Sequence, residues 1–139
     1  MPIGDRLDRA KNAFLLSERQ LLELDADERT LTAAFAHYVR AEFPMWRVDC
    51  EYNRRVTRTK KLRWRHPKIA DRVRPDIIVH RRNTQHNLLV IEAKKSTQSK
   101  ANDRKKLSAF KADPDYQYVH AVLLTFVVGP KPDVTIEEI

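Results

Sequence analysis

The sequence has few of the residues that cross-link or interrupt a chain. A single cysteine, Cys50, among 139 residues excludes an internal disulfide and leaves no readable zinc cluster. We expect Cys50 to be a small buried hydrophobic residue. Glycine occurs twice, so the seven prolines supply most of the punctuation between elements. These features predict one domain, residues 1–139, in the reducing cytoplasm.

Long apolar runs are also missing. No stretch reaches the roughly 18 apolar residues that a membrane-spanning helix needs, and the N-terminus has no apolar segment of signal-peptide type. Apolar residues make up 42% of the chain and charged residues 33%, a balance typical of a folded domain and not of a disordered chain. We therefore expect no membrane partner and no small-molecule cofactor.

Positive charge is present in excess and is concentrated in one segment. The formal net charge is +8, and residues 54–74 alone contain ten basic residues against one acid. Such a segment favours a polyanion such as nucleic acid, with a solvated loop as the alternative. An aromatic group inside a basic loop can stack on bases. The basic loop 54–74 is therefore predicted to bind DNA through Arg54, Arg55, Arg58, Lys60, Lys61, Arg63, Trp64, Arg65 and Lys68.

Helical periodicity appears first along the chain. Residues 5–24 are predicted to be helical, with a break near Ser17, and the segment 1–24 to be an N-terminal helical extension. A second helix ends before Pro44, and Asp25 with Glu28 forms a plausible capping pair at its start. Its apolar residues recur at helical spacing: Leu31, Ala34, Phe35, Tyr38 and Val39. Residues 99–112 are predicted to form a third helix, with Leu107 and Phe110 facing inward.

The remaining segments have the patterns of strands. Residues 46–53 alternate, and residues 118–128 form the continuous apolar run of a central strand. The other predicted strands are 76–80, 88–95 and a short edge strand, 134–136. After the N-terminal helix the order is helix, strand, strand, strand, helix, strand. This order predicts an α/β fold in which a mixed central sheet has helices on both faces.

Charged residues lie at the ends of two neighbouring predicted strands. Asp76 opens the strand 76–80, and Glu92 and Lys94 end the strand 88–95 on one face, because they are two residues apart. If the two strands pair as a hairpin, Asp76 lies near Glu92. A turn residue after a proline is the alternative for Asp76. Charges that continue a strand buried on both faces are costly unless they are paired or bind a metal.

This arrangement of residues suits metal-assisted phosphodiester hydrolysis. Mg²⁺ prefers hard oxygen ligands, so Asp76, Glu92 and the Ala93 carbonyl are candidate ligands, with Mn²⁺ as a substitute ion. A bound ion lowers the pKa of a water and offsets phosphate charge. Lys94 is predicted to orient the water or stabilise developing charge, because a neutral lysine beside two carboxylates is unfavourable.

The same residues carry a family resemblance. Pro75-Asp76 within 74–79, followed by Glu92-Ala93-Lys94 within 88–95, resembles the PD-(D/E)XK phosphodiesterase superfamily, which has the restriction-endonuclease-like fold. The segment 48–54 also resembles a group of small prokaryotic proteins of that superfamily. The resemblance covers roughly residues 28–128. It implies a restriction-endonuclease-like core and magnesium-dependent DNA cleavage, with Asp76 and Glu92 as metal ligands and Lys94 as the catalytic lysine.

Four further charged residues have two interpretations each. Many members of the superfamily place a glutamate of the first core helix beside the metal, which implies Glu28 here, but a capping role explains Glu28 equally well. Glu51 either reaches the metal site or is a solvated strand residue. Asp103 and Lys106 either support Lys94 or the DNA, or form a plain surface pair, and the surface pair is the commoner arrangement.

The sequence thus predicts a Mg²⁺-dependent deoxyribonuclease. One alternative is a catalytically silent nucleic-acid-binding module, and another is a subunit of a larger defence, repair or mobile-element complex. With one predicted site per chain, a homodimer is the hypothesis for cutting both strands of a duplex.

Overall fold

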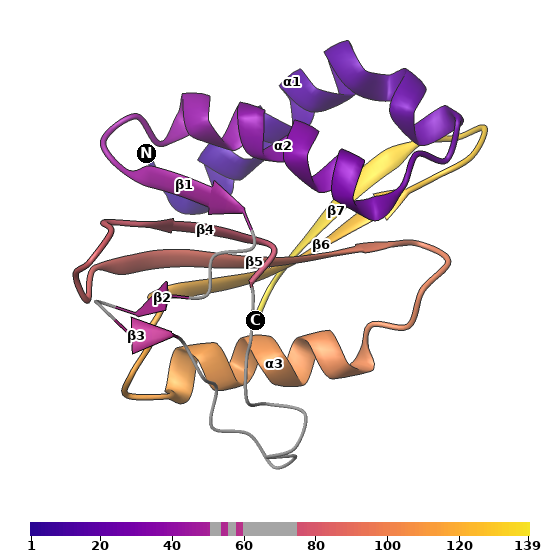
Figure 1. The fold of residues 1–139 in the computed structure, drawn as a ribbon. Coiled ribbons are helices and arrows are strands. Elements are labelled where there is room, and N and C mark those ends of the chain that lie inside the picture. Colours follow the sequence, from indigo (N-terminus) through magenta and orange to yellow (C-terminus); the bar gives the residue numbers. More distant parts are fainter. Residues whose placement is uncertain (51–53, 56–57, 60–74) are drawn as a thin grey trace.

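A computed structural model describes residues 1–50, 54–55, 58–59 and 75–139. Within these residues the chain forms three helices, one five-stranded sheet and one small hairpin (Figure 1). The helices are α1 (Ile3–Glu23), α2 (Glu28–Glu42) and α3 (Ala101–Ala112). The sheet contains β1 (Arg47–Cys50), β4 (Ile77–His80), β5 (Asn87–Lys95), β6 (His120–Val127) and β7 (Asp133–Glu138), and the hairpin contains β2 (Arg54–Arg55) and β3 (Arg58–Thr59).

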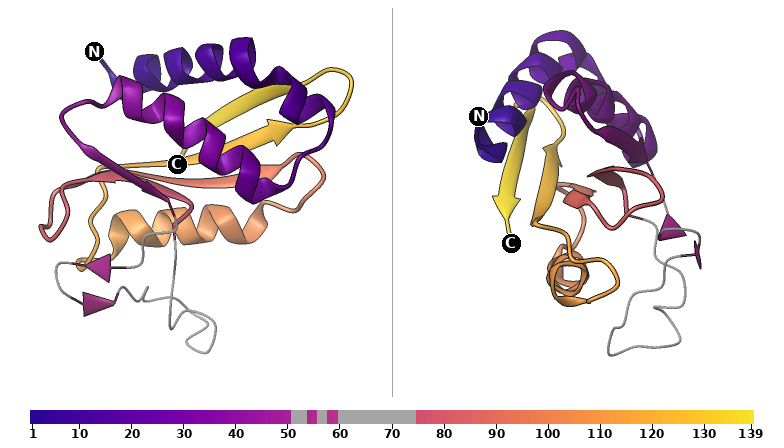
Figure 2. Two further views of the ribbon diagram at one scale, coloured as in Figure 1. Left: turned by 45° about the horizontal axis from the view of Figure 1, so that its top comes forward. Right: turned by 90° about the vertical axis from the view of Figure 1, so that its left-hand side faces the viewer.

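The sheet is mixed and has the order β1-β4-β5-β6-β7. Neighbouring strands are antiparallel except β5 and β6, which are parallel and joined through α3. Helices α1 and α2 cover one face and α3 covers the other (Figures 1 and 2). The predicted α/β class, the order of elements and the helices on both faces are therefore confirmed. The edge strand β7 is longer than the predicted 134–136. No helix in these residues is both long enough and apolar enough to cross a membrane.

The alternation of the strands separates two apolar layers. In β4 and β5, odd-numbered residues such as Ile77 and Ile91 join the core beneath α1 and α2, whereas even-numbered ones such as Ile78 and Val90 join the core beneath α3. Every apolar position of β4 and the middle of β5 is thus buried on one side or the other. This explains why these strands read as continuous apolar runs, and it leaves the strand ends as the places for charged groups.

The ends of the helices bear on two predictions. The break in α1 near Ser17 is confirmed, and the capping role of Asp25 is wrong. Helix α1 has non-helical backbone angles at Glu18, next to the predicted break. Asp25 does not cap α2, because it closes α1: it has a positive φ of 54°, and the bonds Asp25 N–H to Leu22 O and Ala26 N–H to Leu21 O form a Schellman turn. The cap of α2 is Asp27, whose carboxylate accepts the Thr30 N–H at 2.7 Å.

The prediction that Cys50 is buried is wrong. Its thiol is exposed, whereas Val48, two residues earlier on β1, is buried. Cys50 lies at the end of the strand, where it lines an open pocket beside the first two turns of α2. The alternation of residues 46–50 placed Cys50 on the same face as Val48, but it could not show that an open pocket lies between Cys50 and α2.

The aromatic centre of the larger core provides a test of the packing. The Phe35 ring is fully buried, with its centre 5.4 Å from that of Phe14 and 6.1 Å from that of Phe126. Phe35→Ala should lower the free energy of unfolding by about 3–5 kcal/mol, because a large cavity forms. Leu16→Ala on the exposed side of α1 should change it by less than about 0.5 kcal/mol. Urea unfolding followed by circular dichroism measures both, and equal losses would contradict this core.

Candidate active site

The pairing of β4 with β5 brings the predicted acidic residues together. Ile77 lies opposite Ile91 in the antiparallel register, so Asp76, one residue before, lies beside Glu92, one residue after. The Ala93 N–H donates a hydrogen bond of 2.8 Å to Asp76 Oδ2, which fixes the carboxylate at the end of β5. The predicted hairpin is therefore confirmed, and Asp76, Glu92 and Ala93 are neighbours.

Helix α3 adds two charged side chains to the same place. Glu92 and Lys94 share the face of Val90, which α3 covers. Lys106 Nζ lies 3.0 Å from Glu92 Oε1, and Lys94 Nζ lies 3.8 Å from Asp103 Oδ2. We call Asp76, Glu92, Lys94, Asp103 and Lys106 the charged cluster. The prediction that Asp103 and Lys106 form a plain surface pair is wrong, because both point at the sheet.

The sequence did contain a pattern that places these two residues. Asp103 and Lys106 each lie four positions before an inward residue, Leu107 and Phe110, and side chains four apart share one side of a helix. Because α3 has few apolar residues, its sequence favours charged side chains that face solvent. The inward stripe of α3 is apolar toward its C-terminal end and charged toward its N-terminal end.

Burial shapes the electrostatics of the charged cluster. Glu92 is 2% exposed, and burial, followed by the nearby Asp76 carboxylate, raises its pKa well above the ordinary range, against the effect of Lys106. Burial also raises the pKa of Asp103, although Lys94 and Lys106 act in the opposite direction. For Lys106, burial works against the charged form, but Glu92 outweighs it and the pKa is raised. The carboxylates thus repel one another, and the lysines relieve only part of that repulsion.

Glu28 lies beside this cluster, at the first residue of α2. Burial raises its pKa, and the next contributions come from Asp76, which raises it, and Lys94, which lowers it. Glu28 and Asp76 line one pocket of about 360 Å³, together with Arg29, Thr32, Ala33 and Cys50. The capping interpretation of Glu28 is wrong, because Asp27 is the cap. The position of Glu28 instead fits the role that the resemblance implies.

Most of the predicted DNA-binding residues cannot be placed. Arg54, Arg55 and Arg58 lie on the hairpin β2–β3, which is on the same side of the sheet as α3 (Figures 1 and 2). The remaining predicted residues lie outside the described part of the chain: Glu51, Lys60, Lys61, Arg63, Trp64, Arg65 and Lys68. Their metal-binding and DNA-binding roles remain predictions.

A second polar group lies farther along the same face. His80 Nε2 and Asp49 Oδ2 are 2.6 Å apart, and Arg82 forms two hydrogen bonds to the Asp49 carboxylate. Burial works against the charge on Asp49, but the hydrogen bonds from Arg82 and His80 outweigh it and lower the pKa of this carboxyl group. The group joins β1 to the end of β4.

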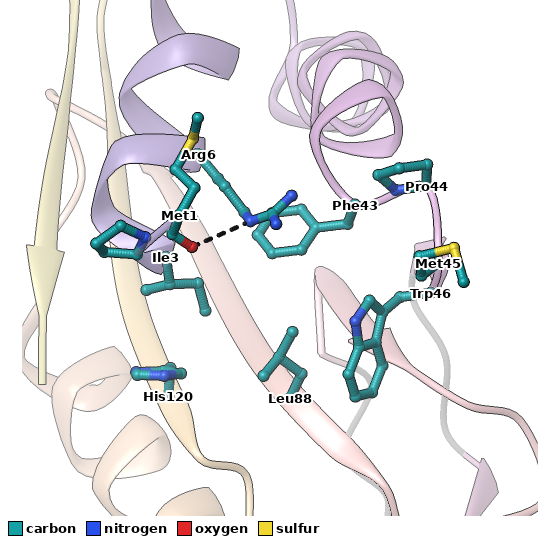
Figure 3. A pocket seen from close by; sticks show the side chains of 10 residues that line it. Met1, Ile3, Arg6, Phe43, Pro44, Met45, Trp46, Leu88 and His120 are labelled. Atoms are coloured by element: carbon teal, nitrogen blue, oxygen red, sulfur yellow. Dashed lines mark hydrogen bonds between the residues drawn. The ribbon is translucent and has the colours of Figure 1, made fainter.

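A second pocket differs from the first in the residues that line it. It measures about 440 Å³ and lies at the opposite end of β5, where Leu88 and His120 begin their strands (Figure 3). Phe43 and Trp46 form its wall, and Arg6 lies over the Phe43 ring. None of the described residues that line it is an acid: Met1, Pro2, Ile3, Arg6, Phe43, Pro44, Met45, Trp46, Leu88 and His120. It therefore lacks the oxygen ligands that phosphodiester chemistry with a metal requires.

The residues around Asp76 fit a divalent cation in charge and donor type. Four carboxylates (Asp76, Glu92, Asp103 and Glu28) face two ammonium groups, which leaves two negative charges when all are ionised. Glu92 Oε1 is fully buried without a well-formed hydrogen bond from the described residues. The Ala93 carbonyl points to the same side of β5 as its N–H, toward Asp76. The described residues contain no ready-made group of three His, Cys, Asp or Glu ligands, so a cation would rely on two carboxylates, a carbonyl and waters.

The raised pKa of Glu92 predicts a pH effect on stability. The pKa of Glu92 is higher in the folded protein than in the unfolded chain, so this residue lowers stability progressively as pH rises above the unfolded value of about 4.3. Glu92→Gln cannot lose a proton. Without divalent ions, its free energy of unfolding should therefore rise relative to wild type as pH increases above about 4.5, as measured by urea denaturation. A constant difference between the two proteins across this range would contradict the raised pKa.

Comparisons of the whole chain with protein-family models, with curated proteins and with solved structures gave no match.

Proposed function

We propose that this protein is a divalent-metal-dependent deoxyribonuclease of the PD-(D/E)XK type with a restriction-endonuclease-like core. The observation that carries the proposal is the meeting of Asp76 with Glu92, Ala93 and Lys94 at the paired ends of β4 and β5. The order α2, β1, β4, β5, α3, β6 agrees with the order that the resemblance implies.

Asp76, Glu92 and the Ala93 carbonyl are the groups that would hold the cation, with Glu28 close to Asp76. When bound, Mg²⁺ or Mn²⁺ supplies Lewis-acid chemistry, which offsets charge on the phosphate oxygens and lowers the pKa of a water. The chain supplies position: the Ala93 N–H orients the Asp76 carboxylate, and the apolar faces of β4 and β5 keep the strand ends in register.

Lys94 has an electrostatic role in this mechanism. Its ammonium group faces Asp103 at 3.8 Å, and its side chain remains 29% exposed, so a phosphate oxygen can approach it from solvent. An ammonium group at this position stabilises negative charge that develops on the phosphorus centre during attack by water. Asp103 positions the lysine and does not itself contact the phosphate.

DNA would approach from the side of the sheet that carries α3. The charged cluster faces this side, and the hairpin β2–β3 of the basic loop lies on it as well. Lysine and arginine side chains neutralise phosphates along the backbone, which gives binding without sequence preference. Since the described residues of each chain form one such cluster, a homodimer would present two sites to the two strands of a duplex.

One observation favours a second candidate, a nucleic-acid-binding module without catalytic activity. Lys106 already faces Glu92 and Lys94 already faces Asp103, so the charged cluster is largely neutralised by the chain itself. A relative that uses these pairs for structure, alone or as a subunit of a larger complex, would bind DNA without cutting it.

A cleavage assay separates the two candidates. Wild-type protein with Mg²⁺ or Mn²⁺ should cut at least one of a panel of plasmid, linear duplex, branched and single-stranded DNA. Asp76→Asn should abolish cleavage, and Lys94→Met should slow it by about 100-fold or more. Lys95→Met is the matched control, because Lys95 is the next residue of β5 and pairs instead with Asp25 at 2.6 Å. Binding of DNA without cleavage under all conditions would support the binding module instead.

The basic loop should determine how DNA affinity depends on salt. Replacing Arg58, Lys60, Lys61 and Arg63 by alanine should reduce the slope of log K against log salt by about 0.9 for each phosphate that the variant no longer neutralises. The matched control replaces four exposed arginines outside this loop: Arg9, Arg19, Arg40 and Arg47. Fluorescence anisotropy with labelled duplex at several salt concentrations gives both slopes. Equal slopes in the two variants would mean that the loop does not contact the DNA.

A further inference from the structure

Lys106 is the basic residue of the charged cluster that the PD-(D/E)XK motif does not include. It projects from the first half of α3 toward β5, and its ammonium group lies 3.0 Å from the buried Oε1 of Glu92. Its side chain is 23% exposed, so Lys106 is largely buried but is not sealed from solvent.

The ammonium group of Lys106 offsets part of the cost of burying the Glu92 carboxylate. A carboxylate that is 2% exposed and lies beside a second carboxylate, Asp76, is costly unless a positive charge lies close to it. Among the described residues that shift the pKa of Glu92, Lys106 is the one cation, and it acts to lower that pKa. The fold therefore places the Lys106 ammonium group at a position where a divalent ion would also supply positive charge.

We infer that Lys106 is a built-in counter-ion that holds Glu92 in the metal-free protein and competes with the divalent ion for that carboxylate. This inference rests on the proposed function. An ammonium group and a divalent ion that share one carboxylate repel each other, so the ion binds more weakly while Lys106 stays in place. The flexible stem of Lys106 allows withdrawal from Glu92, and Asp103, three residues earlier on the same side of α3, offers a second acidic partner.

A purely structural role for Lys106 would give a different experimental result. If Lys106 only anchored α3 to β5, its removal would change the stability of the fold and leave the affinity for a divalent ion unchanged or weaker. Competition instead predicts that loss of the positive charge strengthens ion binding. Metal affinity therefore separates the two roles, and it does so without an activity measurement.

Mn²⁺ binding to the whole chain, measured by electron paramagnetic resonance and calorimetry, provides the test. Lys106→Gln removes the charge but keeps an N–H donor for Glu92 Oε1, and should lower the Kd for Mn²⁺ by about fivefold or more. Lys106→Arg keeps the charge and should stay within about twofold of wild type. Lys105→Gln is the matched control, since Lys105 is exposed on the same helix, and its Kd should not change.

Each remaining outcome has a defined meaning. An unchanged or weaker affinity in Lys106→Gln, with clear binding by wild type, overturns the inference and leaves the proposed metal site standing. Absence of Mn²⁺ binding by every variant, including wild type, overturns both. If Lys106→Gln unfolds without the ion, recovery of its circular dichroism spectrum on adding Mn²⁺ supports the competition, and failure to recover overturns it.

Discussion

The in-register pairing of β4 with β5 is the constraint on which the site depends. Both strands are buried on two faces, so their residues alternate between the core under α1 and α2 and the core under α3. A slip of one residue would turn Glu92 and Lys94 toward α2 and expose the apolar layers to the wrong neighbours. The hydrogen bond from Ala93 to Asp76 extends the pairing one step before Ile77, the first residue of β4, and sets the position of the first acid.

The fold accepts the energetic cost of a buried charge at the end of β5. Fully buried charge is rare in folded proteins unless it is paired, and here Glu92 lies beyond a run of aliphatic residues with Asp76 next to it. Apolar residues of similar volume would pack there at lower cost. Glu92 and Asp103 each have a raised pKa and a lysine partner, and perturbed groups of this kind concentrate at functional sites.

The sequence was sufficient for the parts of the site that follow from strand periodicity. The two-residue spacing of Glu92 and Lys94, and the short connection between two apolar runs, determined that these residues meet Asp76. The contribution of α3 was the less favoured of two interpretations, because a short helix with few apolar residues gives a weak inward stripe, and Asp103 lies on it as a charged residue. The prediction for Asp25 was wrong because a single acidic residue fits both the start of one helix and the Schellman turn that ends another. Long-range contacts decide between such alternatives, and local patterns do not.

The charged cluster and Glu28 beside it depend on the complete fold, because these residues come from both layers. Glu28 enters from α2 on one face of the sheet, Asp103 and Lys106 enter from α3 on the other, and the strand ends lie between them. These residues span positions 28 to 106, so no single hairpin or helix can bring them together alone. Repulsion among the carboxylates opposes this assembly, whereas the two apolar cores drive it. Hydrophobic packing in the two cores therefore fixes the position of the acids. The acids lie where this packing ends, so their charge is available to a ligand.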